Sequence, residues 1–328
     1  MIPFQYIRPT SVKATVEALK KNPSAQLIAG GTNLVDLMKR GVSAPEMLID
    51  INHLPLKKIE QLKNGLQLGA LALNSEVSEN ELVLKNFPLL ALALKAGASQ
   101  QLRNMATVGG NMMQRTRCTY FYDTEMPCNK RVPGSGCGAM KGYNRMSAIF
   151  GTSDSCIAVH PSDMCVALAA LDAEVIIQKA KGGERRIAFT EFHRLPGNTP
   201  EQDNTLQKGE LIVGIVLPAN RLQQHVAYLK VRDRASYAFA LVSVAAALEI
   251  SNNKIVTARL AMGGVAHKPW RLYEAEKMLK GMPAEQASFE AVAKIAMQDA
   301  KTFGHNDFKL RLAPKTIVEA LKQAAGIS

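Results

Sequence analysis

The chain has 328 residues, 47% of them hydrophobic and 21% charged, and this balance excludes an intrinsically disordered protein. Its net charge of +12 comes from basic residues spread along the chain without a helix-turn-helix, finger or RNP motif, so we expect no nucleic-acid partner. There is no run of about eighteen apolar residues and no apolar signal-peptide segment, so we expect neither a membrane span nor an export signal.

The first glycine turn follows a short buried strand predicted at 26–29 and precedes a segment with helical spacing at 34–39. A helix that starts at such a turn presents free backbone N–H groups to a phosphate. Gly30 and Gly31 can adopt positive φ, and Thr32 and Asn33 supply side-chain donors. The turn lacks the spacing of a dinucleotide fingerprint or a P-loop, which argues against NAD and ATP. Taken alone, it is a weak signal that an ordinary turn also explains.

A second glycine turn follows strands predicted at 47–51 and 65–73 and one helix predicted at 82–98. We interpret Thr107-Val108 as a strand end that breaks into Gly109-Gly110-Asn111. Two glycine turns of the same kind favour one pyrophosphate held between two loops.

Four cysteines occur in or just after an irregular segment at 112–151, which is rich in glycine and proline. A long irregular segment inside a compact domain usually has a function. The cysteine intervals match neither a zinc knuckle nor a compact ferredoxin run, so an iron–sulfur cluster, a zinc ion and metal-free buried thiols all remain open. Flanking arginines and lysines favour thiolates. The four candidate ligands are Cys118, Cys128, Cys137 and Cys156.

The second half begins with a helix predicted from the N-cap Ser162 to Leu171. We do not assign Cys165, on this apolar helix, or His160 to the metal set. Asp163 either hydrogen-bonds a cofactor hydroxyl or interacts with the helix dipole. Strands are predicted at 173–178, 185–189 and 210–217, the first two joined by a hairpin at Gly182-Gly183.

The composition changes near residue 220, which divides the chain into 1–220 and 221–328. In the second part, strands followed by helices indicate a small α+β domain. Lys230 is notable because it lies in an otherwise apolar strand. No Ser-His-Asp set, zinc-protease helix or paired-carboxylate site occurs, so we expect no hydrolytic machinery. The predicted strands are 225–231, 239–250 and 255–262, and the predicted helices are 273–279, 287–300 and 315–325.

Several of these motifs resemble the flavoprotein subunits of the xanthine dehydrogenase, or molybdenum hydroxylase, family. The segments Ile28 to Leu34 and Thr107 to Asn111 are similar to the two FAD pyrophosphate loops of that family. Pro161-Ser162-Asp163 and Arg234-Ala235-Ser236-Tyr237-Ala238 occupy the corresponding later places. Arg-Thr-Arg-Cys and Pro-Cys-Asn-Lys-Arg-x-Pro-Gly-Ser-Gly-Cys resemble the periplasmic aldehyde oxidoreductases of bacteria, and the resemblance covers essentially the whole chain.

The resemblance implies an α+β fold with a two-subdomain FAD-binding domain of the vanillyl-alcohol-oxidase (PCMH) type at 1–220, carrying an iron–sulfur insert at about 112–157. A CO-dehydrogenase-flavoprotein-like domain with a three-stranded sheet plus helices would follow at 221–328. The four cysteines match the ligands of an additional [4Fe–4S] cluster. Asp163 would contact a ribityl or ribose hydroxyl, and Lys230 would lie at the isoalloxazine, with Tyr237 nearby. The implied FAD-binding residues are Ile28, Ala29, Gly30, Gly31, Thr32, Asn33, Leu34, Thr107, Gly109, Gly110, Asn111, Gln114, Asp163 and Lys230.

The resemblance also implies an electron-transfer subunit of a heterotrimer, without catalytic residues of its own. A large partner would oxidise the aldehyde at a molybdenum cytosine-dinucleotide cofactor, and a small partner would pass electrons through [2Fe–2S] clusters to FAD. By analogy the chain is periplasmic, exported with a partner that bears a twin-arginine signal; otherwise it is cytoplasmic. The alternatives are a self-contained flavin reductase and a zinc-stapled adaptor that binds acidic proteins or nucleic acid.

Overall fold

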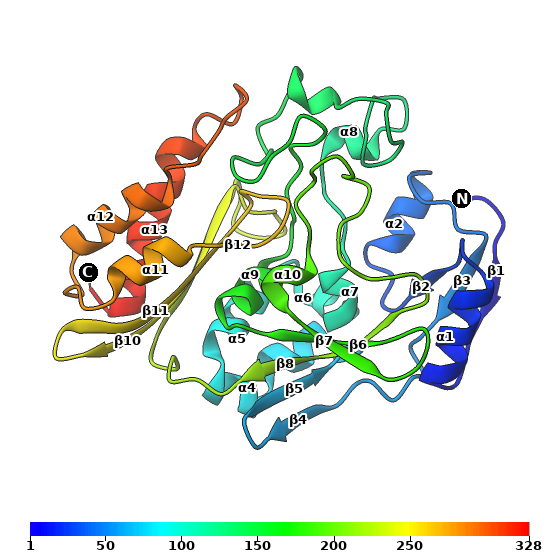
Figure 1. Cartoon of the computed structure of the whole chain (residues 1–328), viewed down its shortest axis with the longest axis horizontal. Coiled ribbons are helices and arrows are strands. Elements are labelled where there is room, and N and C mark those ends of the chain that lie inside the picture. Colours follow the sequence, from blue (N-terminus) through cyan, green and yellow to red (C-terminus); the bar gives the residue numbers. More distant parts are fainter. Residues whose placement is uncertain (328) are drawn as a thin grey trace.

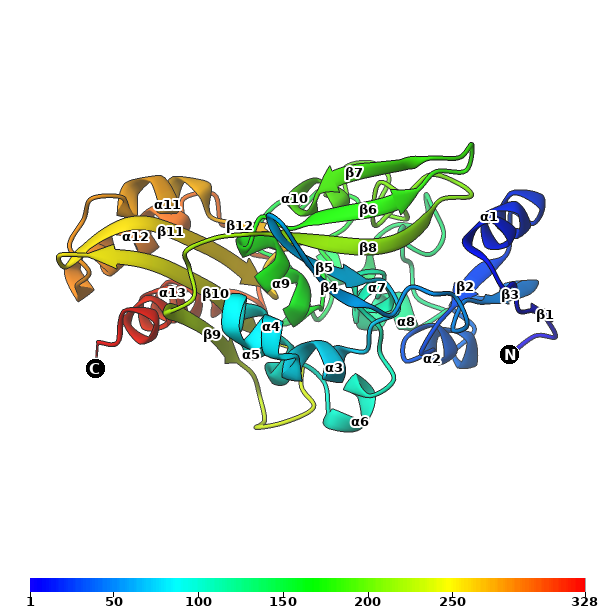
Figure 2. The ribbon, with the colours of Figure 1, turned by 90° about the horizontal axis from the view of Figure 1, so that it is seen from below.

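The computed structural model describes residues 1–327. Their strands form three sheets, and helices pack against these sheets (Figure 1). Seen from below, the N-terminal sheet and the C-terminal sheet lie at opposite ends of the molecule, and the middle sheet lies between them (Figure 2). No helix in this described part is long and apolar enough to cross a membrane.

The N-terminal part is a parallel three-stranded sheet in the order β1-β3-β2, with two helices. Its first helix is capped by Ser11, whose side chain accepts from the Ala14 N–H at 3.1 Å, and ends in two lysines that favour the helix dipole. The strands predicted at 26–29 and 47–51 are confirmed. The elements are β1 (Gln5–Ile7), α1 (Val12–Lys21), β2 (Gln26–Ile28), α2 (Leu34–Lys39) and β3 (Met47–Asp50).

The middle part is a five-stranded antiparallel sheet in the order β4-β5-β8-β6-β7. The hairpin at Gly182-Gly183 joins β6 to β7, as predicted; both glycines have positive φ. The strand predicted at 65–73 ends earlier, at Gly69. The strands are β4 (Ile59–Leu62), β5 (Gly65–Gly69), β6 (Glu174–Gln178), β7 (Glu184–Ala188) and β8 (Leu211–Pro218).

Two predictions in this part are wrong. The single helix at 82–98 is two helices, because Pro88 lacks an N–H donor and starts a new helix. Thr107 does not end a strand: its hydroxyl accepts from the Gly110 N–H at 3.1 Å and caps a short helix. The helices are α3 (Asn74–Glu79), α4 (Glu81–Asn86), α5 (Pro88–Ala96), α6 (Gln100–Arg103), α7 (Val108–Met112), α8 (Thr119–Tyr122), η1 (Gly138–Met140), α9 (Asp163–Ala170) and α10 (Phe189–Phe192).

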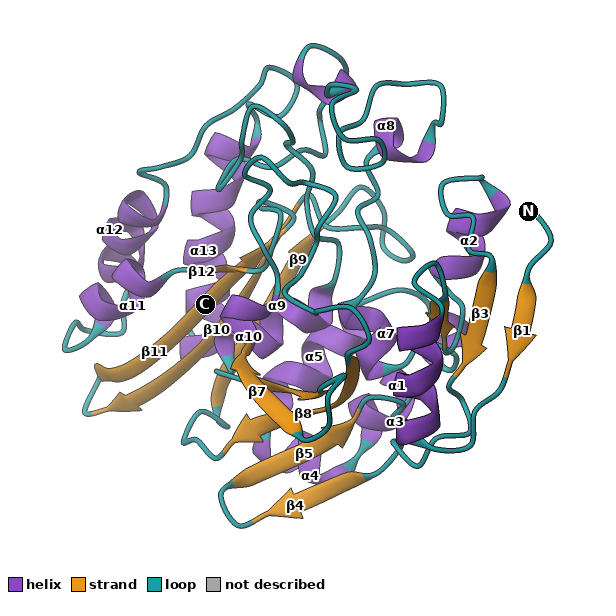
Figure 3. Cartoon of the chain, turned by 45° about the vertical axis from the view of Figure 1, so that its right-hand side comes forward, coloured by secondary structure: helices purple, strands orange, loops and turns teal. Residues whose placement is uncertain are grey.

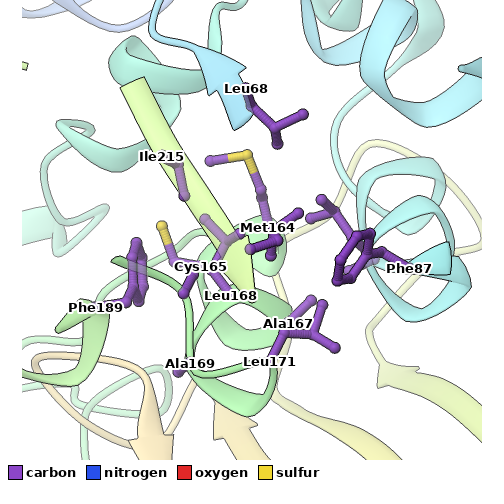
Figure 4. Close-up of a cluster of buried hydrophobic side chains, with 14 of the residues drawn as sticks. Leu68, Phe87, Met164, Cys165, Ala167, Leu168, Ala169, Leu171, Phe189 and Ile215 are labelled. Carbon is purple, nitrogen blue, oxygen red and sulfur yellow. The ribbon is translucent and has the colours of Figure 1, made fainter. Parts of the chain in front are cut away.

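Helix α9 lies at the centre of the molecule and is buried on every side. It packs against α5 and against strands of the C-terminal sheet, so it joins the two larger parts. A helix without a polar face is expected only in such a position. Figure 4 shows Cys165 and Leu168 of this helix among apolar neighbours that include Phe189 and Ile215. Cys165 therefore packs as a small hydrophobic side chain, as predicted.

The C-terminal part is an antiparallel sheet in the order β12-β11-β10-β9, covered on one face by three helices (Figure 1). The sheet has four strands and not the predicted three. The fourth strand, β12, was not predicted because it has only two residues and shows no periodicity. The last helix starts at Lys309, before the predicted 315. It continues through Pro314, which lies outside the predicted helix. The elements are β9 (His225–Val231), β10 (Val242–Ser251), β11 (Lys254–Gly263), β12 (Trp270–Arg271), α11 (Tyr273–Leu279), α12 (Gln286–Ala296) and α13 (Lys309–Ala325).

The loops form a layer of their own beside the sheets (Figure 3). The cysteine segment runs through this layer and carries only α8 and η1 as regular structure. The predicted domain boundary near 220 falls between β8 and β9 and stays a prediction.

Candidate functional site

A cleft of about 810 Å³ is bordered by both glycine turns, by the start of α9 and by the end of β9. Seven of the predicted FAD-binding residues line it, and so does Tyr237. The other predicted residues, namely Ile28, Ala29, Gly30, Gly31, Leu34, Thr107 and Gly109, do not line the cleft. The seven that line it are Thr32, Asn33, Gly110, Asn111, Gln114, Asp163 and Lys230.

Gly30 allows the first turn to touch the chain just before the second turn. A Cβ added at Gly30 would lie 1.8 Å from the carbonyl oxygen of Met105, so only glycine permits this approach. The Arg115 N–H, just beyond the second turn, donates to Asn33 Oδ1 at 2.9 Å. The two turns are therefore held together by a close backbone approach and by a hydrogen bond to the Asn33 side chain, although more than 70 residues separate them in the sequence.

Unpaired polar atoms in the cleft wall indicate a polar ligand. Asn33 Nδ2 is buried and has no hydrogen-bond partner among the described residues, and the same is true of Asn74 Oδ1. Buried polar groups nearly always have partners, so a donor and an acceptor without one mark places where a ligand completes the site. Asn111 Oδ1 is already occupied: it accepts from Gln114 Nε2 at 2.6 Å and from Ser162 Oγ at 2.7 Å.

The charge of the cleft matches a dianionic group. Five basic and three acidic side chains line it, an excess of two positive charges. In residues 1–327, Arg40, Arg103 and Arg234 have no carboxylate within ion-pair distance; Arg103 donates to the Gly97 carbonyl at 2.8 Å. Sequence reasoning missed Arg40 and Arg103, because each is a single arginine near a helix end without any motif. A pyrophosphate would neutralise this excess.

Asp163 and Lys230 form a buried ion pair of 2.8 Å, with side chains 8% and 4% exposed. The Tyr228 hydroxyl also donates to Asp163, at 2.7 Å, and Lys230 donates to the Ala96 carbonyl at 3.1 Å. Burial, together with the Asp163 charge, raises the pKa of Tyr228 well above its usual value, so this hydroxyl stays a donor. Each carboxylate oxygen of Asp163 keeps a further lone pair for a ligand hydroxyl. Asp163 also lies in the first turn of α9, so its two predicted roles are compatible.

The four predicted ligand cysteines line one small cavity, the thiol cavity. Cys128 and Cys137 face each other in an antiparallel bridge, closed by the Gly138 N–H donating to the Pro127 carbonyl at 2.9 Å. Asn129 connects this hairpin to the turn that carries Cys156, because its Nδ2 donates to the Ser155 carbonyl at 3.0 Å. The segment is therefore folded around the thiols.

Burial makes two of these thiols weak acids in the absence of a metal. Burial, with a smaller contribution from neighbouring cysteines, raises the pKa of Cys118 to about 11 and that of Cys156 to about 12. A bound cation would reverse this preference, because it stabilises thiolates directly. No three of the four sulfur atoms lie within 4.8 Å of one another in the described chain.

A smaller cavity of about 170 Å³ lies between the cleft and the thiol cavity. It shares Arg117 and Asp163 with the cleft, and Thr116 and Cys118 with the thiol cavity. Cys118 is therefore the cysteine on the side of the cleft.

His160, Cys165 and His193 also gather within 4.8 Å, but their hydrogen bonds argue against a metal. His160 Nδ1 accepts from the Ser162 N–H at 3.4 Å, which leaves the ring proton on Nε2. His193 Nε2 donates to the Met112 carbonyl at 2.9 Å. Burial lowers the pKa of His160 well below its usual value and that of His193 to about 4, so both rings are neutral near pH 7. His193 was not singled out by the sequence.

We expect the stability of the protein to fall as the pH drops from 7 to 5. Burial lowers the pKa of His193 and of His267 to about 4, so the unfolded chain binds more protons than the folded chain between about pH 6.5 and 4. Each histidine would remove about 2 kcal/mol of unfolding free energy between pH 7 and 5. Urea unfolding at both pH values measures this. The substitution His193→Gln should reduce the loss of unfolding free energy between pH 7 and 5, and substitution of the exposed His53 should not. An equal pH dependence in the unchanged chain and in both variants would contradict the prediction.

Comparison with known proteins places the chain in a family. Residues 2–220 match the FAD binding domain in molybdopterin dehydrogenase, and residues 227–324 match the CO dehydrogenase flavoprotein C-terminal domain. The chain belongs to the FAD-binding subunits of the xanthine dehydrogenase, or molybdenum hydroxylase, family. The predicted family and the predicted α+β fold of this flavoprotein subunit are thereby confirmed, as is its place in an oxidoreductase.

Individual relatives of this flavoprotein subunit extend over most of the chain. It is 46% identical over 322 residues to the aldehyde oxidoreductase FAD-binding subunit PaoB of Escherichia coli K12, covering 98% of both chains. It is 30% identical to the glyceraldehyde dehydrogenase medium chain of Sulfolobus acidocaldarius, covering 85% of this chain and 81% of that one. A chain of the carbon monoxide dehydrogenase of Hydrogenophaga pseudoflava has the same fold, with a TM-score of 0.78, 25% identity and 99% coverage of both chains.

Proposed function

We propose that this flavoprotein subunit transfers electrons within a three-subunit, molybdenum-dependent aldehyde oxidoreductase. Its FAD would receive electrons from [2Fe–2S] clusters of a small partner and deliver them to an external acceptor. The aldehyde would be oxidised at the molybdenum cofactor of a large partner. The observation that carries the proposal is the single cleft bordered by both glycine turns, Asp163 and Lys230, in a chain so similar to an aldehyde oxidoreductase subunit.

The residues of the cleft fit FAD. The pyrophosphate would lie between Thr32-Asn33 and Gly110-Asn111, where the unpartnered Asn33 Nδ2 donates to a phosphate oxygen. Asp163 would accept from a ribityl or ribose hydroxyl, and Lys230 would lie beside the isoalloxazine. When bound, FAD supplies the conversion between single electrons and electron pairs. The protein contributes binding, orientation and the positive charge of the wall.

The proposal includes a [4Fe–4S] cluster held by Cys118, Cys128, Cys137 and Cys156. All four line one cavity, and buried neutral thiols gain most from a cationic partner. Sulfur atoms around a single zinc ion would lie about 3.8 Å apart, since Zn–S bonds are about 2.3 Å long and tetrahedral. The wider separation of these thiols favours a polynuclear cluster over one zinc ion. A cluster here would also explain why so irregular a segment is ordered.

The location and the partners follow from the same proposal. The complex would act in the periplasm, reached by way of a partner that bears a twin-arginine signal. The excess of basic side chains would face acidic surfaces of the large or the small subunit.

A visible absorption spectrum combined with metal analysis of the purified chain tests the proposal. We expect a yellow-brown protein with FAD and about four irons per chain, inert towards aldehydes on its own. Aldehyde oxidation by the isolated chain would contradict the assignment of that chemistry to a partner. A colourless zinc protein would favour the adaptor, and a yellow protein without iron would remove the cluster from the proposal.

A further inference from the structure

Lys130 is a buried cation in the wall of the thiol cavity. Its side chain is 1% exposed, and its ammonium donates to the Pro200 carbonyl at 2.7 Å and to the Asp203 carboxylate. Lysine is almost never fully buried unless it is paired, so its place between Cys128 and Cys137 in the sequence calls for an explanation. Lys130 lines the same small cavity as Cys156 and the other three thiols, so a buried positive charge lies beside the whole set.

Asp203 is shared between two cations. It pairs with Lys130 and, at 2.7 Å, with Arg115 Nε. Burial opposes ionisation, but Lys130 and Arg115 hold the pKa of Asp203 well below its usual range. His267 lies 3.9 Å from the same carboxylate, and burial lowers its pKa to about 4, so it is neutral near pH 7. The group therefore carries one net positive charge beside the thiol cavity.

We propose that Lys130 is a redox-tuning residue whose ammonium raises the reduction potential of the cluster bound by the four cysteines. The inference rests on the proposed function, because it requires that cluster. One-electron reduction, by dithionite in the experiment, adds one negative charge to the cluster and its thiolates and needs no proton. A fixed positive charge in a dry site stabilises the reduced form more than the oxidised form. Asp203, which acts through Lys130, offsets part of this effect and is a positioning residue.

A purely structural role for the pair makes a different prediction. Lys130 and Asp203 also connect the cysteine segment to the loop before β8, so either substitution could simply loosen the cavity. Loosening would change the potential in the same direction, or release iron, in both variants. Electrostatic tuning instead requires opposite changes, because one substitution removes a positive charge and the other a negative charge.

The test is an EPR-monitored redox titration of the full chain in four forms: unchanged, Lys130→Met, Asp203→Asn and Lys141→Met. We expect the cluster potential to fall in Lys130→Met and to rise in Asp203→Asn. Lys141→Met is the control, since it removes the same charge from an exposed position of the same segment, where water and salt screen it. Its potential should not change.

The outcomes separate this inference from the proposed function. Opposite shifts support it, as does a rise in Asp203→Asn if Lys130→Met fails to hold iron. Four outcomes would overturn the role of Lys130: unchanged potentials, shifts in the same direction, a shift as large in Lys141→Met, or loss of iron from both Lys130→Met and Asp203→Asn. None of these would contradict the proposal that the unchanged chain binds a cluster. An unchanged chain without iron would overturn the cluster itself.

Discussion

Replacing Gly30 with alanine is expected to weaken FAD binding strongly. The new methyl carbon would lie 1.8 Å from the Met105 carbonyl oxygen, which belongs to backbone and cannot rotate away. The two turns would have to separate, and with them Asn33 and Gly110, which line the cleft. Inserting a methyl group into packed structure usually costs about 1–3 kcal/mol, and a backbone obstacle places this case at the upper end, about a hundredfold in affinity. Flavin content after purification and FAD titration of the apoprotein measure the effect.

Gly41→Ala is the matched control for this experiment. Gly41 follows the neighbouring helix α2 with a φ of 72°, and a Cβ there would meet nothing within 4 Å. The substitution therefore adds the same methyl group and costs about 1–2 kcal/mol of left-handed strain, without pushing the turns apart. FAD content should stay at one per chain in Gly41→Ala. Full flavin content in Gly30→Ala would show that the approach of the two turns is not needed for the cofactor.

Substituting Cys118 with serine is expected to remove most of the iron and to leave the flavin. Serine is a poor replacement for a thiolate ligand, so iron should fall from about four per chain towards zero. The cleft wall is built mainly by other elements, and Cys118 does not line the cleft itself. The brown absorption should disappear while the yellow flavin bands persist. Paired iron and flavin determinations on one preparation give both numbers.

Cys165→Ser provides the comparison, because Cys165 is fully buried in α9 and lies outside the thiol cavity. Its hydroxyl would enter an apolar core, at a cost of about 1–3 kcal/mol in unfolding free energy. The iron content should not change. Iron retained in Cys118→Ser would refute the ligand set, and iron lost only from Cys165→Ser would move the site to the core helix.

Most of the local elements could be predicted because their signals are local. Ser162 caps α9 through its own side chain, and Gly182-Gly183 closes a hairpin by φ alone. The β-branched and aromatic residues of β9, together with its length, indicate a strand without help from its neighbours. The two glycine turns could also be located from local sequence, as could the segment that contains the four candidate cysteines. Two of the errors, at Thr107-Val108 and at Pro88, arose where a helix cap or a missing N–H outweighed the apolar pattern.

The assembly of the site was decided by contacts between distant residues. Nothing near Gly30 indicates that Met105 will touch it, and nothing near Lys130 indicates that Asp203 will neutralise it. Arg40 and Arg103 became candidates only once the cleft was formed. The sequence by itself determined where the glycine turns, the Ser162 cap and the cysteine segment lie. These features depend on the residue types and backbone geometry within a few residues. Only the tertiary structure decided which of them share a cavity and a charge, because packing and ion pairing act between segments that no sequence period relates.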